Sequence, residues 1–140
     1  MTKRFLCFNM GCVGTMIAGL FGGWNGALST LCTFMVIDYL LGICCAMFFK
    51  NSKKTKSGKL SSKEMIKGII KKVGELLLVM IAVRLDILTG ETYVKDGTII
   101  ALVVYETISI IENLGLIGVP IPKIIRRTID VLREDENNEQ

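Results

Sequence analysis

The 140-residue chain has no histidine, so it lacks the side chain that most often serves as a general base or metal ligand near neutral pH. It also has no glycine-rich phosphate loop before a helix and no serine or cysteine nucleophile beside a base. Its five cysteines have no metal-ligand spacing and are interpreted as small apolar packing residues. These absences predict a protein that is not an enzyme and uses no cofactor or metal.

Charge is almost absent from Phe5 to Phe49, where Asp38 is the only charged side chain. As one helix, these roughly 45 residues would be about 68 Å long, more than twice the ~30 Å hydrocarbon thickness of a bilayer. The chain must therefore reverse, and the Gly-Gly-Trp-Asn-Gly stretch at 22–26 suits a tight turn. We predict two membrane spans near 5–22 and 27–49. The alternative, a buried hairpin of a soluble protein, is disfavoured because the run leaves no polar face.

The overall composition points the same way, because 51% hydrophobic residues leave little polar surface for a soluble globule of this size. We predict an all-α fold in one membrane domain, residues 1–140, with about three to four hydrophobic helices. Lys3 and Arg4 before the apolar run are also typical of a signal peptide. Retention as a true span is favoured, because the uncharged run continues far beyond any cleavage site.

Small residues recur at four-residue spacing along the first predicted span. They form two ridges: Gly11, Thr15, Gly19 and Gly23 in one, and Gly14, Ala18, Gly22 and Gly26 in the other. Such ridges let helix backbones approach closely in lipid, where packing drives association. Two interpretations stay open: self-association of the protein, or packing against the second span.

Asp38 lies near the middle of the second predicted span. Left charged at the bilayer centre, a carboxylate costs about 2.5–3.5 kcal/mol on insertion scales. We interpret it as a contact or water-lining group or as a protonated acid, with a neutral, hydrogen-bonded group of no further role as the alternative.

A further hydrophobic segment, Thr98 to Gly118, carries its polar residues on one stripe. The stripe consists of Glu106, Ser109, Glu112 and Asn113, at three- and four-residue steps. In a membrane such a stripe faces protein or water and avoids lipid tails. The alternative is the surface helix of a soluble domain with its polar side exposed.

Nine lysines fall between residues 50 and 72. Residues 50–59 predict a solvated loop, and Ser61 with Glu64 forms a capping box that opens an interfacial helix. The basic residues expected to face anionic lipid on the cytoplasmic side are Lys53, Lys54, Lys56, Lys59, Lys63, Lys67, Lys71 and Lys72. Nucleic acid is not expected as a partner, because no aromatic side chains interleave with these lysines.

The third hydrophobic segment, Val73 to Leu88, is ambiguous. Only about 11 residues separate Lys72 from Arg84, which is short for a span. It crosses only if the basic side chains snorkel, or if a protein partner satisfies Glu75 and Arg84. At the other end, prolines at 120 and 122 end the fourth helix. A short amphipathic helix follows at 123–132, and the acidic tail from 134 is predicted to be disordered.

The distribution of lysine and arginine predicts the topology. With four crossings, the basic residues at 3–4, 50–72 and 123–133 are all cytoplasmic, and only Lys95 lies outside. We therefore divide the chain into a hairpin (1–49), a basic cytoplasmic loop and interfacial helix (50–72), a second hairpin (73–118) and a cytoplasmic tail (119–140). Two crossings would also leave the basic loop inside.

Four sequence pieces resemble the toxin-secretion and phage-lysis holins of Gram-positive bacteria, the family that includes the clostridial toxin-locus holin. They are FGGWNGAL at 21–28, IDYLLG at 37–42, KGIIKKVGELLLV at 67–79 with RLD at 84–86, and YETISIIENLGLIGVPIP at 105–122. The last piece is the most specific, because an acidic helix face is followed by Gly-Val-Pro-Ile-Pro. The cysteine-rich first span and the acidic tail do not match any hallmark of the family.

The resemblance implies a holin that forms homo-oligomers in the bacterial cytoplasmic membrane. Such proteins make lesions through which an endolysin or a toxin leaves the cell. Glu75, Arg84, Asp38 and the polar stripe would then line the lesion. Two rivals stay open: a non-conducting, antiholin-like regulator, and a small ion or solute carrier, although no inverted repeats are visible.

Overall fold

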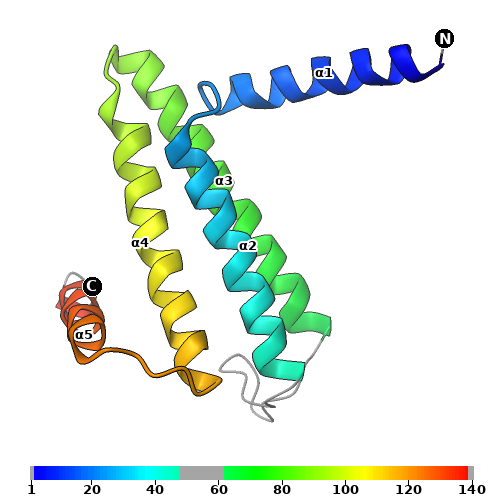
Figure 1. Cartoon of the computed structure of the whole chain (residues 1–140). Helices are drawn as coiled ribbons and strands as arrows, with labels where there is room; N and C mark the ends of the chain where they lie inside the picture. Colours follow the sequence, from blue (N-terminus) through cyan, green and yellow to red (C-terminus); the bar gives the residue numbers. More distant parts are fainter. Residues whose placement is uncertain (1, 48–61, 139–140) are drawn as a thin grey trace. The chain divides into compact units, whose positions relative to one another are not determined.

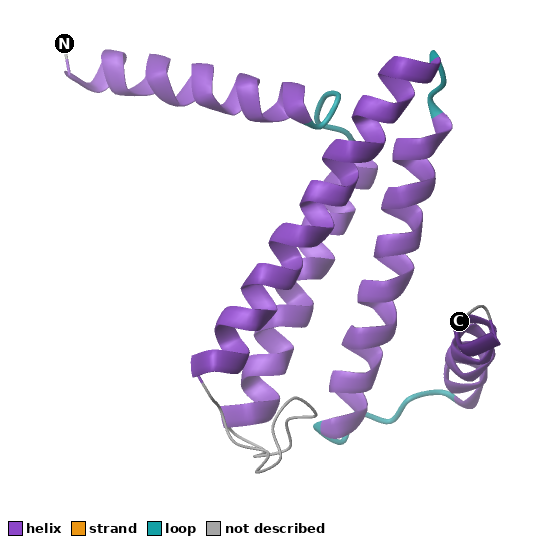
Figure 2. Ribbon diagram, turned by 180° about the vertical axis from the view of Figure 1, so that it is seen from behind, coloured by secondary structure: helices purple, strands orange, loops and turns teal. Residues whose placement is uncertain are grey.

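The computed structural model describes residues 2–47 and 62–138, and within them every regular element is a helix (Figures 1 and 2). The all-α prediction is therefore confirmed for the described residues. The helices are α1 (Thr2–Leu20), α2 (Gly26–Met47), α3 (Ser62–Thr89), α4 (Tyr93–Leu116) and α5 (Lys123–Asn138). The predicted basic loop at 50–59 and the capping residue Ser61 lie outside the described residues.

Helix α3 differs from the expected division into an interfacial helix and a separate third segment. It is one continuous helix of 28 residues, about 42 Å long. The lysines at 63–72 change the polarity of its surface but do not interrupt it, because lysine is a good helix former. Helix α5 likewise extends to Asn138, so the disorder predicted from residue 134 is wrong up to that point. Leucine, arginine and glutamate after residue 131 are good helix formers.

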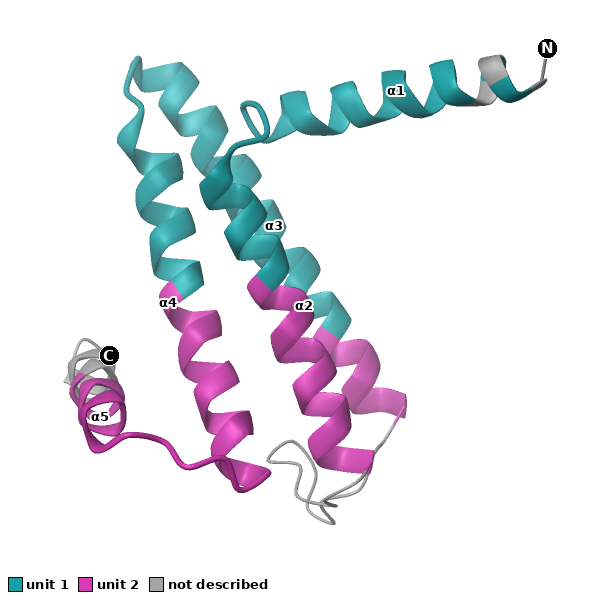
Figure 3. Ribbon diagram, viewed as in Figure 1, with its two compact units in different colours: residues 1–33, 69–103 teal, residues 34–68, 104–140 magenta. Residues whose placement is uncertain are grey.

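The chain divides into two compact units, coloured separately in Figure 3. Unit 1 comprises residues 1–33 and 69–103, and unit 2 comprises 34–68 and 104–140. Helices α2, α3 and α4 are each divided between the two units, with one segment in each unit. The most buried apolar side chains of unit 1 are Leu28, Leu31, Val79, Ala82, Val83 and Ile99. In unit 2 they are Met35, Cys45, Ala46 and Ile129.

The turn between α1 and α2 lies where the glycine cluster predicts it. Gly22 and Gly23 have φ angles of 66° and 91°, a region that L side chains rarely adopt. A Cβ atom at Gly22 would lie 3.2 Å from Cγ1 of Val83, so close approach also favours glycine there. The Asn25 side chain then caps α2, because its Oδ1 accepts a hydrogen bond from the backbone N–H of Leu28 at 2.9 Å.

Helix α4 ends at Leu116, ahead of both prolines. The backbone N–H of Val119 donates to the carbonyl of Leu114 at 3.0 Å, and Gly118 has a φ of 87°. This left-handed glycine closure satisfies carbonyls of the last turn. The prolines at 120 and 122 therefore follow a helix end that Gly118 has already made.

Asp86 holds the hairpin between α3 and α4 within unit 1. Its two carboxylate oxygens accept hydrogen bonds from the first turn of α4: Oδ1 from the N–H of Val94 at 3.0 Å and Oδ2 from the N–H of Lys95 at 2.9 Å. The Lys95 ammonium in turn donates to the carbonyl of Gly22 at 3.4 Å. Asp86 is thus an N-cap supplied by the preceding helix, with a negative charge at the positive end of α4.

Replacing Asp86 with alanine should lower the free energy of unfolding by about 1–2 kcal/mol, because two first-turn amides lose their acceptor. Chemical unfolding in detergent micelles, followed by circular dichroism, measures the change. Asp86→Asn is the matched control, since its single carbonyl oxygen retains one of the two bonds and should recover part of the loss. Equal stability of Asp86→Ala and the parent chain would contradict the capping role.

Candidate functional site

Asp38 is the centre of a polar cluster within unit 2. Its side chain is only 4% exposed, and its Oδ1 accepts hydrogen bonds from two side chains of α4. Ser109 Oγ donates at 2.5 Å and Asn113 Nδ2 donates at 3.1 Å. The segment of α2 in this unit is thus joined to the segment of α4 by hydrogen bonds to one carboxyl group.

The spacing of the α4 residues explains how they reach the same carboxyl group. Ser109 and Asn113 are four residues apart, so they lie one above the other on a single helix face. Glu106 precedes them on that face and is completely buried, while Glu112 is half-buried. The predicted polar stripe is therefore a protein-facing surface in this part of the structure.

Two further contacts in unit 2 surround the cluster. The thiol of Cys45 is buried and donates to the backbone carbonyl of Asn113 at 3.5 Å. A Cβ atom at Gly68 of α3 would lie 3.3 Å from the Tyr39 ring, so the absence of a side chain there lets the ring lie close to the helix. Sequence reasoning did not single out Tyr39 or Gly68, whose pairing has no local signal.

The ionisable residues predicted in α3 have different environments. Glu75 is 6% exposed, and its Oε2 lies 4.0 Å from the Lys72 ammonium one helical turn earlier. Arg84 is exposed. The structure thus pairs Glu75 with a residue of its own helix that the sequence prediction had assigned to the lipid-facing set.

The remaining predicted basic residues of α3 lie on its surface. Lys63, Lys67 and Lys71 are exposed, and the Lys67 ammonium lies 3.1 Å from Glu64 Oε1. Lys53, Lys54, Lys56 and Lys59 lie outside the described residues. Exposed Ile66, Ile69 and Ile70 accompany the described lysines on α3.

The two predicted small-residue ridges are interrupted after Leu20, where α1 ends: Gly11, Gly14, Thr15, Ala18 and Gly19 lie on α1, whereas Gly22 and Gly23 lie in the turn and Gly26 begins α2. Cβ atoms built at Gly11, Gly14, Gly19, Gly23 and Gly26 would meet nothing within 4 Å, whereas Gly22 approaches α3. Thr15 donates to the carbonyl of Gly11 within its own helix, at 2.9 Å. The glycines of α1 therefore have no close neighbour from another element among the described residues, and their role in association stays a prediction.

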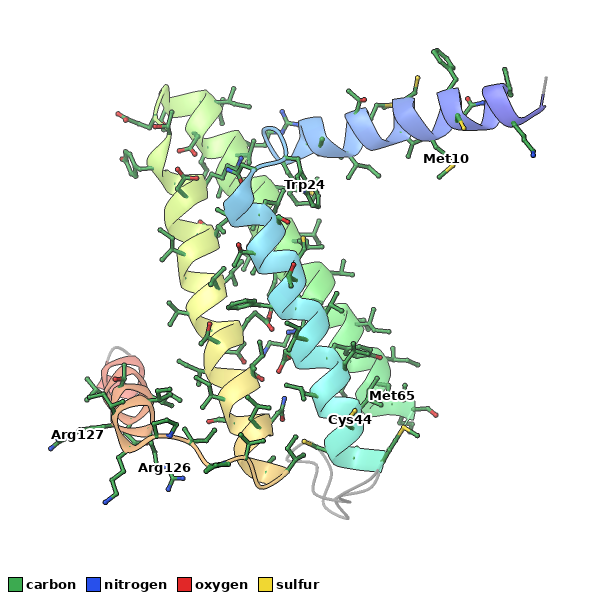
Figure 4. All side chains as sticks on the ribbon, in the orientation of Figure 1. Met10, Trp24, Cys44, Met65, Arg126 and Arg127 are labelled. Atoms are coloured by element: carbon green, nitrogen blue, oxygen red, sulfur yellow. The ribbon has the colours of Figure 1, made fainter. Side chains whose placement is uncertain are left out.

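Alongside the apolar core, several carboxyl groups are buried in the same helices that expose large aliphatic side chains. Among the described residues, the carboxyl groups of Asp38, Glu75, Asp86 and Glu106 are buried. Large aliphatic side chains are exposed along the same helices: Val36 and Leu40 of α2, Leu77, Leu78 and Ile81 of α3, and Ile100 of α4. Figure 4 shows these helices with side chains projecting outward along their length. Carboxyl groups inside and aliphatic groups outside suit a hydrocarbon solvent.

The donors and acceptors of the cluster form a hydrogen-bond network around Asp38. Within the described residues, no three carboxylate or thiol groups are close enough together to hold a metal ion. A carboxyl group in such a network can exchange its hydrogen-bond donors: the side chains of α4 that bind Asp38 can be replaced by water.

Helix length and composition define the class of protein. Helices α2 and α4 are long and apolar enough to cross a bilayer, and Cys7–Leu20 is a shorter apolar stretch. Together with the buried carboxyl groups and the exposed aliphatic side chains, these helices indicate a helical membrane protein. The chain matches the bacteriophage holin family over residues 15–134 and belongs to that family. The family is generally non-enzymatic.

Several bacterial proteins are similar over nearly their whole length. An uncharacterized protein of Clostridium perfringens is 35% identical over 136 residues, which cover 94% of this chain and 95% of the relative. A 14.9 kDa protein of Clostridium perfringens, described as lying in the nagH 3′ region, is 35% identical and covers 86% of both chains. A protein of Halalkalibacterium halodurans is 30% identical, with 96% and 98% covered. No solved structure matches the chain.

Replacing Ser109 with alanine should lower the free energy of unfolding by about 1–3 kcal/mol, because a buried carboxyl group loses one donor. Unfolding in detergent micelles measures the difference. Ser29→Ala, a half-buried serine of α2 outside the cluster, is the matched control and should change stability by less than about 0.5 kcal/mol. If both variants matched the parent, the hydrogen bond to Asp38 would have no stabilising role.

Proposed function

We propose that this chain is a holin: it forms homo-oligomers in the cytoplasmic membrane of a bacterium and opens lesions through which an endolysin or a toxin passes. The observation that carries the proposal is the buried carboxyl cluster of unit 2 in a member of the holin family. Lipid rejects such groups, whereas an assembled, water-filled lesion accepts them. Endolysin or toxin is a functional partner and need not contact the chain.

The hydrogen bonds around Asp38 supply a mechanism. In the dispersed protein, Ser109 and Asn113 satisfy Asp38 within the chain, and Glu106 is buried beside them on α4. On assembly, water replaces these partners and the polar face of α4 lines the lesion. Moving one charge through the membrane field is worth about 2.3 kcal/mol per 100 mV, so loss of the potential would favour the change.

The proposed topology has four crossings and cytoplasmic termini. The length of α3 supports it, because residues 73–88 continue a helix that already exists and need not form a short separate span. In unit 1, α3 is followed after three residues by α4, which is long enough to cross. If α3 crosses as well, α4 returns the chain to the cytoplasmic side; if α3 stays at the surface, a crossing by α4 places the C-terminus outside. The open small-residue ridges of α1 provide a surface for contact with a second copy.

Inducible expression of the chain alone in bacteria tests the function. Membrane potential is followed together with the release of a cytoplasmic reporter protein once a muralytic enzyme is supplied. A holin should depolarise the cells abruptly and release the reporter. Selective ion flux with the reporter retained would indicate a carrier. If the chain by itself neither depolarised the cells nor released the reporter, but changed the timing of lysis by another holin, it would be a regulator.

The double variant Glu106→Gln and Glu112→Gln should delay lysis and reduce leakage. Glutamine is polar but uncharged, so the drive to transfer these positions from lipid or protein to water is weaker; a charged acid costs about 2.5–3.5 kcal/mol at the bilayer centre. The onset of depolarisation after induction measures the delay. Glu91→Gln, in the exposed turn after α3, is the matched control and should keep parental timing. Unchanged timing in the double variant would refute the lesion-lining role.

A further inference from the structure

Helix α5 is amphipathic, with an apolar face and a charged face. At about 100° per residue, Ile124, Ile125, Thr128, Ile129 and Val131 share an arc of about 160°. Ile124 and Val131 are 73% and 53% exposed, so much of this apolar face is uncovered by the chain itself. An amphipathic helix of this length gains most of its stability from burial of its apolar face.

The charged residues between positions 123 and 131 of α5 are arranged around that face in a specific order. Arg127 lies beyond one margin of the apolar arc and Arg126 beyond the other, while Lys123 and Asp130 lie between them on the opposite side. Both arginines are exposed and project outward from α5 (Figure 4). Long basic side chains at the margins can reach headgroup phosphates while the aliphatic residues between them enter the hydrocarbon boundary. In that orientation Asp130 lies on the side of the helix that faces water.

The connection to α4 brings this helix near a bilayer surface. Helix α4 ends at Leu116 and α5 begins at Lys123, so fully extended chain separates the two by at most about 25 Å. Since α4 is long and apolar enough to cross the membrane, α5 starts within reach of the leaflet where α4 ends.

We propose that α5 lies on an anionic lipid surface, with Ile124, Ile125 and Val131 in the interface and with Arg126 and Arg127 on lipid phosphates. The partner is the bilayer itself, recognised by negative headgroups beside accessible hydrocarbon. The inference requires that α4 lie in a membrane, but it does not require lesion formation. A chain that fails to depolarise cells can therefore still meet the test below.

Hydrogen exchange of the full chain in vesicles tests the proposal. The chain is reconstituted in phosphatidylcholine alone and in phosphatidylcholine with one-third phosphatidylglycerol, and amide exchange over residues 123–131 is compared. We expect about tenfold slower exchange in the anionic vesicles. High salt, which shortens the Debye length to about 3 Å at 1 M, should reverse most of the difference.

Two paired variants separate charge from helix propensity. Arg126→Glu with Arg127→Glu should abolish the lipid-dependent protection, whereas Arg126→Lys with Arg127→Lys should keep it. Ile124→Gln should lower protection in the anionic vesicles without slowing or speeding exchange in α4. Equal exchange in both vesicle types would overturn the proposal. Protection that followed the protein-to-lipid ratio instead of lipid charge would also overturn it, in favour of a second copy as the partner.

Discussion

Hydrocarbon offers no hydrogen-bond partner, so every polar side chain within a membrane-crossing helix must find one in protein or water. Asp38 imposes this requirement most strongly in unit 2. Ser109 and Asn113 meet it, and they determine which face of the α4 segment is turned toward the α2 segment. Glu106 lies on the same face of α4 and is buried with it. The aliphatic residues then fill the remaining surface, where packing against lipid is unselective.

The chemistry of these contacts matters for a protein proposed to change state. A hydrogen bond exchanged for one to water changes the free energy by only about 1 kcal/mol, whereas exposing an aliphatic interface to water costs about 25 cal/mol per Å². An α2–α4 contact made through Asp38, Ser109 and Asn113 is therefore easier to hydrate than one made through leucine alone. In the proposed mechanism, the contact that stabilises the dispersed chain is also the contact that water enters.

Periodicity and composition predicted most of the elements, because both act locally. The uncharged run located α1 and α2, the glycines at 22 and 23 located their turn, and the stripe on α4 indicated a face that avoids lipid. Local signals did not predict contacts between residues that are distant in the sequence. They also suggested a helix boundary where a cluster of charged residues lies inside a continuous helix. Asp86 became a cap only because the hairpin brings the α4 amides to it, and the pairing of Tyr39 with Gly68 depends on tertiary packing. The lysines of α3 coincide with a more polar part of the helix surface and not with a helix end.

In the proposed mechanism, the buried carboxyl groups limit how a water-filled lesion can form. The aliphatic side chains of α2, α3 and α4 already face outward, so their contact with lipid need not change. The carboxyl groups of Asp38, Glu75 and Glu106 are already buried within the chain, so none of these three has to cross hydrocarbon to reach water that enters between the helices. The proposed assembly then requires only separation of helix segments and entry of water between them. A rotation of α4 that exposed Glu106 to lipid would be far more costly, so the proposed lesion is expected to open by entry of water between the helices and not by rotation of α4.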